Sequence, residues 1–315
     1  MTTPPPLSGR LTPPEFAHFA DVVTRFVAAA ESLLKREMSY PFSIGSDALR
    51  DSAAYLDYPG TQSKQTLLTL ATQQVAVGHE QCDLLLGIAA ILRADRVTLS
   101  PFPLARTSAV IAAKAWHVLT AGSREERLRR YLNEELAALY GLPFPSDDEG
   151  AVTERNDRTA DYLAVGATAG LEPVYRKKPR LWDSPILARA GRGFDDAPPS
   201  ETQLVKDFYR ASGLQDDELA GMPYSLLSAA THGRFRQAGL VGYAAAGSSV
   251  GGVLAAAMHA TLDVTAETTM YAAIAMRAYL CALAQYTAVS EEIVMDRLKE
   301  PIAEWWAIAH PPAAS

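Results

Sequence analysis

The sequence predicts an all-α fold. Alanine is frequent in this chain and β-branched residues rarely cluster, a balance that favours helices over strands. Helix-start signals followed by apolar residues at helical spacing recur along the chain, and no convincing run of alternating strand residues accompanies them. We therefore expect residues 12–310 to form one multi-helix, bundle-like domain after a disordered tail over residues 1–11.

The first helix shows how the elements are predicted. Thr12 is an expected N-cap, Pro13 suits the first helical position, and Glu15 completes a capping box. Apolar residues from Phe16 to Leu33 follow at helical spacing. The same reasoning predicts helices over residues 12–38, 62–94 (or two helices joined near Gly78), 100–122, 123–140, 149–170, 200–212, 223–236, 250–262, 265–287 and 290–308.

Three of these helices begin at a serine. Ser100 precedes Pro101, which repeats the cap-plus-proline start, whereas Ser123 and Ser200 each open a capping box. The short Gly-Leu-Pro connection at residues 141–143 predicts that the helices on either side of it pack as a hairpin.

Two segments interrupt the helical pattern. Residues 171–199 contain five prolines and a basic cluster, which predicts a long irregular excursion that could act as a lid or an interaction loop. Between Arg236 and Asp263 the chain has no Asp, Glu, Lys or Arg. This second stretch is long enough for a membrane span, but its many glycines and alanines contribute little transfer energy. We expect a buried, closely packed segment and no membrane partner.

Composition restricts the function. The formal net charge of −7 argues against a nucleic-acid-binding surface, which normally requires a basic face. The two cysteines, Cys82 and Cys281, form neither a disulfide framework nor a zinc site, and the start of the sequence lacks a secretory signal pattern. We therefore expect a cytoplasmic protein. No spacing typical of a metal site or a nucleotide-binding loop occurs, so we expect neither a metal nor a cofactor.

Two predicted helices place polar groups on a stripe that should face inward. Arg106 and His117 are eleven residues apart in one helix, and Ser225 and His232 are seven apart in the other. At 3.6 residues per turn, both spacings return a side chain to nearly the same face. Because polar groups are costly to bury without partners, these stripes predict a lined pocket between the two helices.

The residue types suggest the chemistry of such a pocket. Arg106 could clamp a small anionic ligand through a carboxylate or phosphate, with Tyr224 lining the site; equally, it could pair with an acidic residue of a neighbouring helix. His232 or His117 could move protons near neutral pH, and Ser228 stands four residues before His232, as a nucleophile would. A purely structural role for His232, bridging two helices, remains open.

A third histidine, His79, is a further candidate. It has Asp83 four residues later, so it could be a base oriented by a carboxylate or an ordinary core residue. The arginines of helix 123–140 alternate with glutamates, which predicts a salt-bridged solvent face, and the aspartate pair at 195–196 is interpreted as a solvated turn. Helix 265–287 carries an apolar row that could form a homodimer surface or pack in the core: Met270, Ala273, Ile274, Leu280 and Leu283.

Four short patterns resemble helical proteins distantly related to the HEPN superfamily: Leu104-Ala-Arg106, Trp116-His117, Arg127-x-x-Arg130 and Tyr224-Ser-x-x-Ser228-x-x-x-His232-Gly233. The resemblance implies a helical fold in which one long helix carries an arginine and another carries a serine and a histidine. HEPN ribonucleases depend on an arginine followed four to six residues later by a histidine. Here Arg234 and Arg236 follow His232, so the order is reversed and nuclease activity is not implied.

Two classes of function follow from the sequence, and it does not decide whether the protein is an enzyme. The first is a small-molecule enzyme or binder that uses Arg106 as the anion clamp and a histidine as general acid or base. The second is a non-catalytic, HEPN-like interaction or regulatory protein of the defence or toxin–antitoxin type, in which the same residues are core hydrogen-bonding groups.

Overall fold

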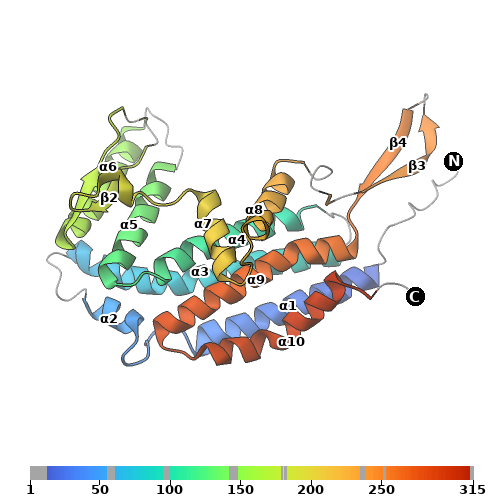
Figure 1. The fold of residues 1–315 in the computed structure, drawn as a ribbon, viewed down its shortest axis with the longest axis horizontal. Helices are drawn as coiled ribbons and strands as arrows, with labels where there is room; N and C mark the ends of the chain where they lie inside the picture. Colours follow the sequence, from blue (N-terminus) through green and yellow to red (C-terminus); the bar gives the residue numbers. More distant parts are fainter. Residues whose placement is uncertain are drawn as a thin grey trace.

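The computed structural model describes residues 13–54, 61–94, 99–141, 148–178, 180, 183–234, 239–240, 242–250 and 253–312. The predicted tail over residues 1–11 and the predicted N-cap Thr12 lie outside these ranges. The described helices are α1 (Pro13–Arg36), α2 (Asp47–Ala54), α3 (Thr61–Ala94), α4 (Pro101–Leu119), α5 (Arg124–Gly141), α6 (Glu149–Thr168), α7 (Glu201–Ala211), α8 (Asp217–Thr231), α9 (Leu262–Thr287) and α10 (Glu291–Ala309). The all-α prediction is confirmed, since these helices share one core (Figure 1).

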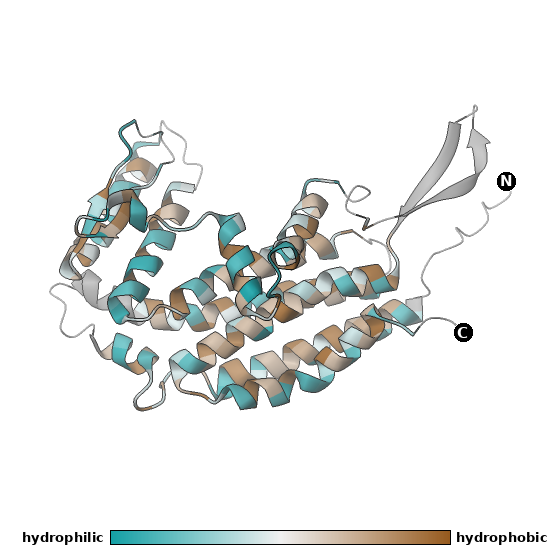
Figure 2. Ribbon diagram, viewed as in Figure 1, coloured by the Kyte–Doolittle hydropathy of each residue, from teal (hydrophilic) through white to brown (hydrophobic). Residues whose placement is uncertain are grey.

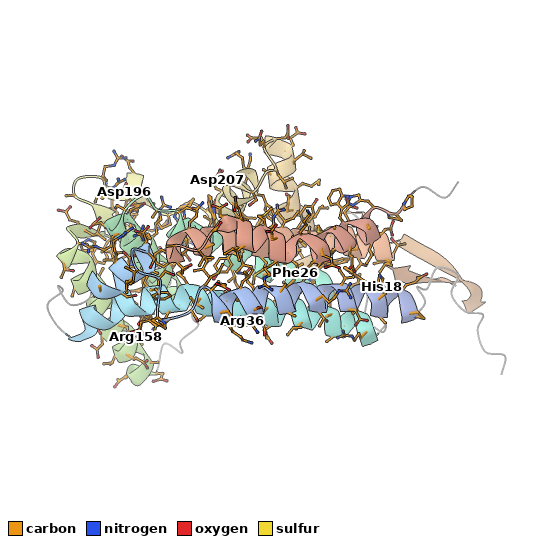
Figure 3. All side chains as sticks on the ribbon, turned by 90° about the horizontal axis from the view of Figure 1, so that it is seen from below. His18, Phe26, Arg36, Arg158, Asp196 and Asp207 are labelled. Atoms are coloured by element: carbon orange, nitrogen blue, oxygen red, sulfur yellow. The ribbon has the colours of Figure 1, made fainter. Side chains whose placement is uncertain are left out.

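Helix α9 lies at the centre of the bundle, where it packs on α4, α10 and α3 (Figure 1). Trp305 of α10 is fully buried and meets the rings of Phe19 and Phe26 of α1 edge-on, at 5.3 and 5.8 Å between centroids. Its indole Nε1 donates a hydrogen bond to the carbonyl of Ala266 on α9, at 3.0 Å. The Trp305 side chain therefore connects α10 to α1 and α9. Figure 3 labels Phe26, one of its two ring partners on α1.

Helix α3 runs without a break through Gly78, so the two-helix alternative for this segment is not what forms. A Cβ atom at Gly78 would lie 2.6 Å from Cδ2 of Leu34, and the glycine therefore permits close packing of α1 on α3. The stretch Thr69–Ala94 has the length and composition of a membrane-spanning helix. Core helices of soluble proteins can have the same length and composition, and α3 packs on α1 and α4. The stretch is therefore weak evidence for a membrane location.

The serine-based helix starts are borne out to different degrees. Ser123 accepts a hydrogen bond from the backbone N–H of Glu126 at 3.2 Å, and Ser200 accepts one from Gln203 at 3.3 Å. Ser100 does precede α4, but its backbone is already helical and its side chain makes no capping bond. A capping serine bonds to the N–H of the second or third helical residue, and the third residue of α4, Pro103, has no N–H. The proline at the first position therefore marks this start.

The uncharged stretch is not helical where we expected a helix over residues 250–262. It forms the antiparallel strands β3 (Gly242–Val250) and β4 (Val253–His259), which extend from the helical body (Figure 1). Glycine destabilises helix interiors, and this stretch is rich in it, so pairing between two strands satisfies the backbone instead. The predicted helix 223–236 is also wrong in its bounds, because α8 ends at Thr231.

The proline-rich excursion is more ordered than predicted. Strands β1 (Leu171–Val174) and β2 (Ile186–Arg189) pair antiparallel and lead into the short 3-10 helix η2 (Gly193–Asp196). The Asn133 amide of α5 both donates to the carbonyl of Leu187, at 3.0 Å, and accepts from its N–H, at 2.7 Å. This segment is therefore fixed to α5.

Two interpretations of polar residues are corrected. Arg127 and Arg129 are buried rather than part of a solvent face, and Asp196 is buried rather than solvated. Their partners explain this: Arg127 pairs with Asp51, whereas Arg129 donates to the carbonyl of Asp196 at 2.5 Å.

Of the two alternatives for the apolar row of α9, the structure shows core packing: Met270, Ala273, Leu280 and Leu283 are buried, and Ile274 is partly buried against the core. Figure 2 shows the hydrophilic residues of α5 and α7 in teal.

Candidate functional site

Arg106 of α4 is already engaged within the protein. Its Nη2 atom lies 2.9 Å from Oε1 of Glu201 at the start of α7 and 3.2 Å from the hydroxyl of Tyr224 on α8. That hydroxyl donates to the same Glu201 oxygen at 2.9 Å, and the guanidinium carbon stands 5.3 Å from the tyrosine ring centroid. The Nε atom of Arg106 is buried without a hydrogen-bond partner among the described residues. The group predicted to hold a small anionic ligand therefore has an internal carboxylate as its partner.

His117 lies on the same helix as Arg106 but far along it. Eleven residues correspond to about 16 Å of helix. Burial, with the nearby charges of Arg130 and Arg129, lowers the pKa of His117 to about 4. Its imidazole is therefore neutral at pH 7, whereas a proton-transfer group working near neutral pH needs a pKa close to that pH.

The other predicted site residues are also dispersed. His232 is the C-cap of α8 and its side chain is exposed. Ser228 lies one turn earlier, where its carbonyl accepts the backbone N–H of His232 at 3.0 Å. His79 is half-buried on α3. The structure thus brings Arg106 and Tyr224 together and adds Glu201, but in the part of the chain that it describes no side chain of His117, His79, Ser228 or His232 bonds to these three.

A cavity of about 310 Å³ lies in a different place, between α3, α4 and α5. Its apolar wall comes from α3, α4 and α5: Val77, Ile111, Ala115, Val118 and Ala138. Its polar wall comes from the same helices: Gln73, Gln74, Glu80, Lys114, Tyr131, Glu134 and Glu135. We call this cavity the α3–α4–α5 pocket. Small-molecule sites typically combine apolar wall residues with polar groups that converge on the ligand, and this pocket has both.

A chain of hydrogen bonds fixes one side of the α3–α4–α5 pocket. The Tyr131 hydroxyl donates to Oε1 of Gln73 at 2.7 Å, and Nε2 of Gln73 donates to Oε1 of Glu135 at 3.1 Å. The other oxygen of Glu135 accepts from the hydroxyl of Tyr162 on α6, at 2.9 Å. Burial raises the pKa of Tyr131, so this phenol stays protonated and acts as a donor. The orientation of the Glu135 carboxylate is therefore set by two neutral donors.

Gln74 is a deeply buried polar residue of this wall. Only 4% of the residue is exposed, and its Oε1 atom is buried without a hydrogen-bond partner among the described residues. Its backbone carbonyl is engaged, because the Tyr279 hydroxyl donates to it. A buried amide oxygen without a partner is costly in a folded protein, so such a group is a candidate for contact with a ligand. Rotation of the amide exchanges its oxygen and nitrogen, so it can offer an acceptor or a donor.

The sequence pattern that marks this pocket is a pair of glutamines within the apolar stripe of α3. The apolar stripe of α3 passes through Ala71, Val75, Cys82 and Leu85, and glutamines at positions 74 and 81 interrupt it. Their spacing of seven keeps both on one face, the same pattern that drew attention to Ser225 and His232. Within the described part of the chain, no three His, Cys, Asp or Glu residues gather as a metal-ligand set.

Comparisons with known proteins add no relatives. No protein-family model matches the chain, and no match to it was found among curated proteins or solved structures. The resemblance to HEPN-related proteins therefore stays a prediction.

Proposed function

We propose that this chain is a non-catalytic small-molecule-binding protein whose site is the α3–α4–α5 pocket. The observation that carries this proposal is the 96% burial of Gln74 in a pocket wall with a partnerless amide oxygen. A ligand that bonds to this amide would relieve the cost of burying it. The pocket volume of about 310 Å³ is at the lower end of the usual range for ligand sites and suits a small compound.

The wall composition favours binding over catalysis. None of the residues that line this pocket is a histidine, cysteine or serine. The groups predicted for acid–base and nucleophilic chemistry, His117, His232 and Ser228, lie elsewhere, and His117 is held neutral. A cytoplasmic location is part of this proposal, and the free thiols of Cys82 and Cys281 support it.

Two neighbouring alanines of α5 provide a matched test. Ala138 lines the pocket and is exposed, so Ala138→Trp should fill the mouth without disturbing the core. Ala137 is also exposed but is not part of the wall, so Ala137→Trp is the control. We expect ligand-observed NMR with a library of small fragments to find compounds that bind the wild type and Ala137→Trp but not Ala138→Trp. A library without any such compound would overturn the proposal.

A further inference from the structure

The charges of the α3–α4–α5 pocket are unbalanced. Four ionisable side chains that carry charge at pH 7 line it: Glu80, Glu134, Glu135 and Lys114. Nζ of Lys114 lies 2.9 Å from Oε2 of Glu134, and this ion pair cancels one charge of each sign. Two carboxylates remain, so the wall carries a charge of −2.

Neither remaining carboxylate is neutralised by a bonded cation. Glu135 accepts only from the Gln73 amide and the Tyr162 hydroxyl, which are both uncharged. The Arg158 guanidinium interacts electrostatically with Glu135, but its Nη2 bonds to the Tyr162 hydroxyl, at 3.3 Å, and not to the carboxylate. Glu80 has no hydrogen bond or ion pair to a described residue. Figure 3 labels Arg158 on α6.

We propose that the α3–α4–α5 pocket binds an organic ammonium ion, with its charged end at Glu135 and Glu80 and its hydrocarbon part on the apolar wall. This inference rests on the proposed function and names its ligand class. An ammonium group supplies three donors, which suits carboxylate oxygens and the partnerless Gln74 oxygen. The apolar wall made by Ile111 and Val118 disfavours a bare metal ion, which would require oxygen ligands on all sides.

Three probes that differ only in the head group measure the effect of the ligand's charge on binding. Hexylammonium, 1-hexanol and hexanoate share one hydrocarbon chain and differ in the head group. We expect hexylammonium to bind the wild type at least tenfold more tightly than 1-hexanol by isothermal titration calorimetry, and hexanoate to bind more weakly than either. Because exposed charges are screened by salt, the affinity for hexylammonium should fall when the NaCl concentration rises.

Variants assign the effect to the pocket. Glu135→Gln should weaken hexylammonium binding by about tenfold and leave 1-hexanol binding unchanged, since it removes the charge and keeps the size of the side chain. The new amide can still accept from Gln73, and the Tyr162 hydroxyl can turn to accept from its NH2 group. Glu300→Gln changes the net charge equally, but Glu300 is an exposed residue of α10, so this variant should behave like the wild type.

The two proposals fail in different ways. The ammonium assignment alone is overturned if hexanoate binds as tightly as hexylammonium, if Glu135→Gln leaves the amine affinity unchanged, or if other fragments bind in an Ala138-dependent manner and hexylammonium does not. If no compound gives a signal that Ala138→Trp abolishes, the binding function fails and the ammonium assignment fails with it.

Discussion

The guanidinium of Arg127 on α5 and the carboxylate of Asp51 on α2 form a buried bidentate ion pair. Nε of Arg127 lies 2.8 Å from Oδ2 of Asp51, and Nη2 lies 3.2 Å from Oδ1. The exposed fractions of the two side chains are 6% and 1%. The Tyr286 hydroxyl of α9 adds a hydrogen bond to Oδ2 at 3.0 Å, so three helices meet at one carboxylate.

Removal of one partner of this pair should be strongly destabilising. Asp51→Ala leaves the buried Arg127 charge with only the more exposed carboxylate of Asp47, at 3.4 Å, as a counter-ion, and breaking a buried pair costs about 3–5 kcal/mol. Urea unfolding followed by circular dichroism measures this loss of unfolding free energy.

The double variant Asp51→Leu with Arg127→Met should lose less unfolding free energy than Asp51→Ala, because neither charge is then buried. Asp21→Ala, which breaks the exposed pair with Arg93, should have a much smaller effect. Equal losses in all three variants would contradict this account.

His117 should make the protein less stable in mild acid. Its pKa is about 4 in the folded protein and near 6.5 in the unfolded chain. Between these values the unfolded state binds a proton that the folded state does not, so the unfolding free energy falls as the pH is lowered from 6.5 towards 4. One such group gives a slope of at most about 1.4 kcal/mol per pH unit.

The variant His117→Gln should reduce this slope, measured by urea unfolding between pH 7 and pH 5. His232→Gln is the matched control, because it makes the same substitution at an exposed residue. An unchanged pH dependence in His117→Gln would show that the imidazole is not buried in its neutral form.

The cluster of Arg106, Glu201 and Tyr224 should contribute to stability rather than to ligand binding. Tyr224→Phe removes a hydroxyl that joins the other two groups, and we expect a loss of about 1 kcal/mol of unfolding free energy. Fragment binding in the α3–α4–α5 pocket should be unchanged in Tyr224→Phe and in Arg106→Met. Full retention of stability in both variants, together with loss of binding of an anionic fragment at Arg106, would instead support the anion-clamp role that the sequence predicted for this residue.

Substitution of alanine for glycine should lower the unfolding free energy at position 78 and raise it at position 221. Gly78→Ala places a Cβ atom 2.6 Å from the buried Leu34, and overpacking of this kind typically costs about 1–3 kcal/mol. Gly221 lies inside α8 with open space around the position of a Cβ, so Gly221→Ala should stabilise the protein by about 0.5–1 kcal/mol through helix propensity. Thermal unfolding of both variants checks the sign of each effect. Stabilisation of both would show that Leu34 moves aside at little cost.

Local signals predicted the helices well. The capping serines at positions 123 and 200 act within three residues, so their hydrogen bonds depend only on nearby sequence. The burial of Arg127 could not be predicted in this way, because its partner Asp51 is 76 residues away in the chain. The strands over residues 242–259 were missed for a different reason: alanine and glycine carry little strand preference, so the pattern of side chains does not alternate.

The candidate site was predicted less well than the fold. Spacing predicted an inward-facing stripe for Arg106 and His117, and Tyr224 was predicted to line the same site; the structure does bring Arg106 and Tyr224 together. The second predicted stripe was wrong, because Ser225 and His232 are exposed. The sequence could not show that Glu201 would pair with Arg106, because the two residues are 95 positions apart in the chain. A spacing argument finds residues on one face of a helix, but it does not show which neighbouring helix satisfies them.

The two hydrogen bonds between Asn133 and the backbone of Leu187 have a mechanical consequence. Here a helix side chain takes the place that a third strand would fill beside β2. The β1–β2 hairpin cannot shift without either breaking both bonds or turning α5 with it. Because α5 also carries Tyr131 and Glu135, a force applied to this distant hairpin would be transmitted to the pocket wall.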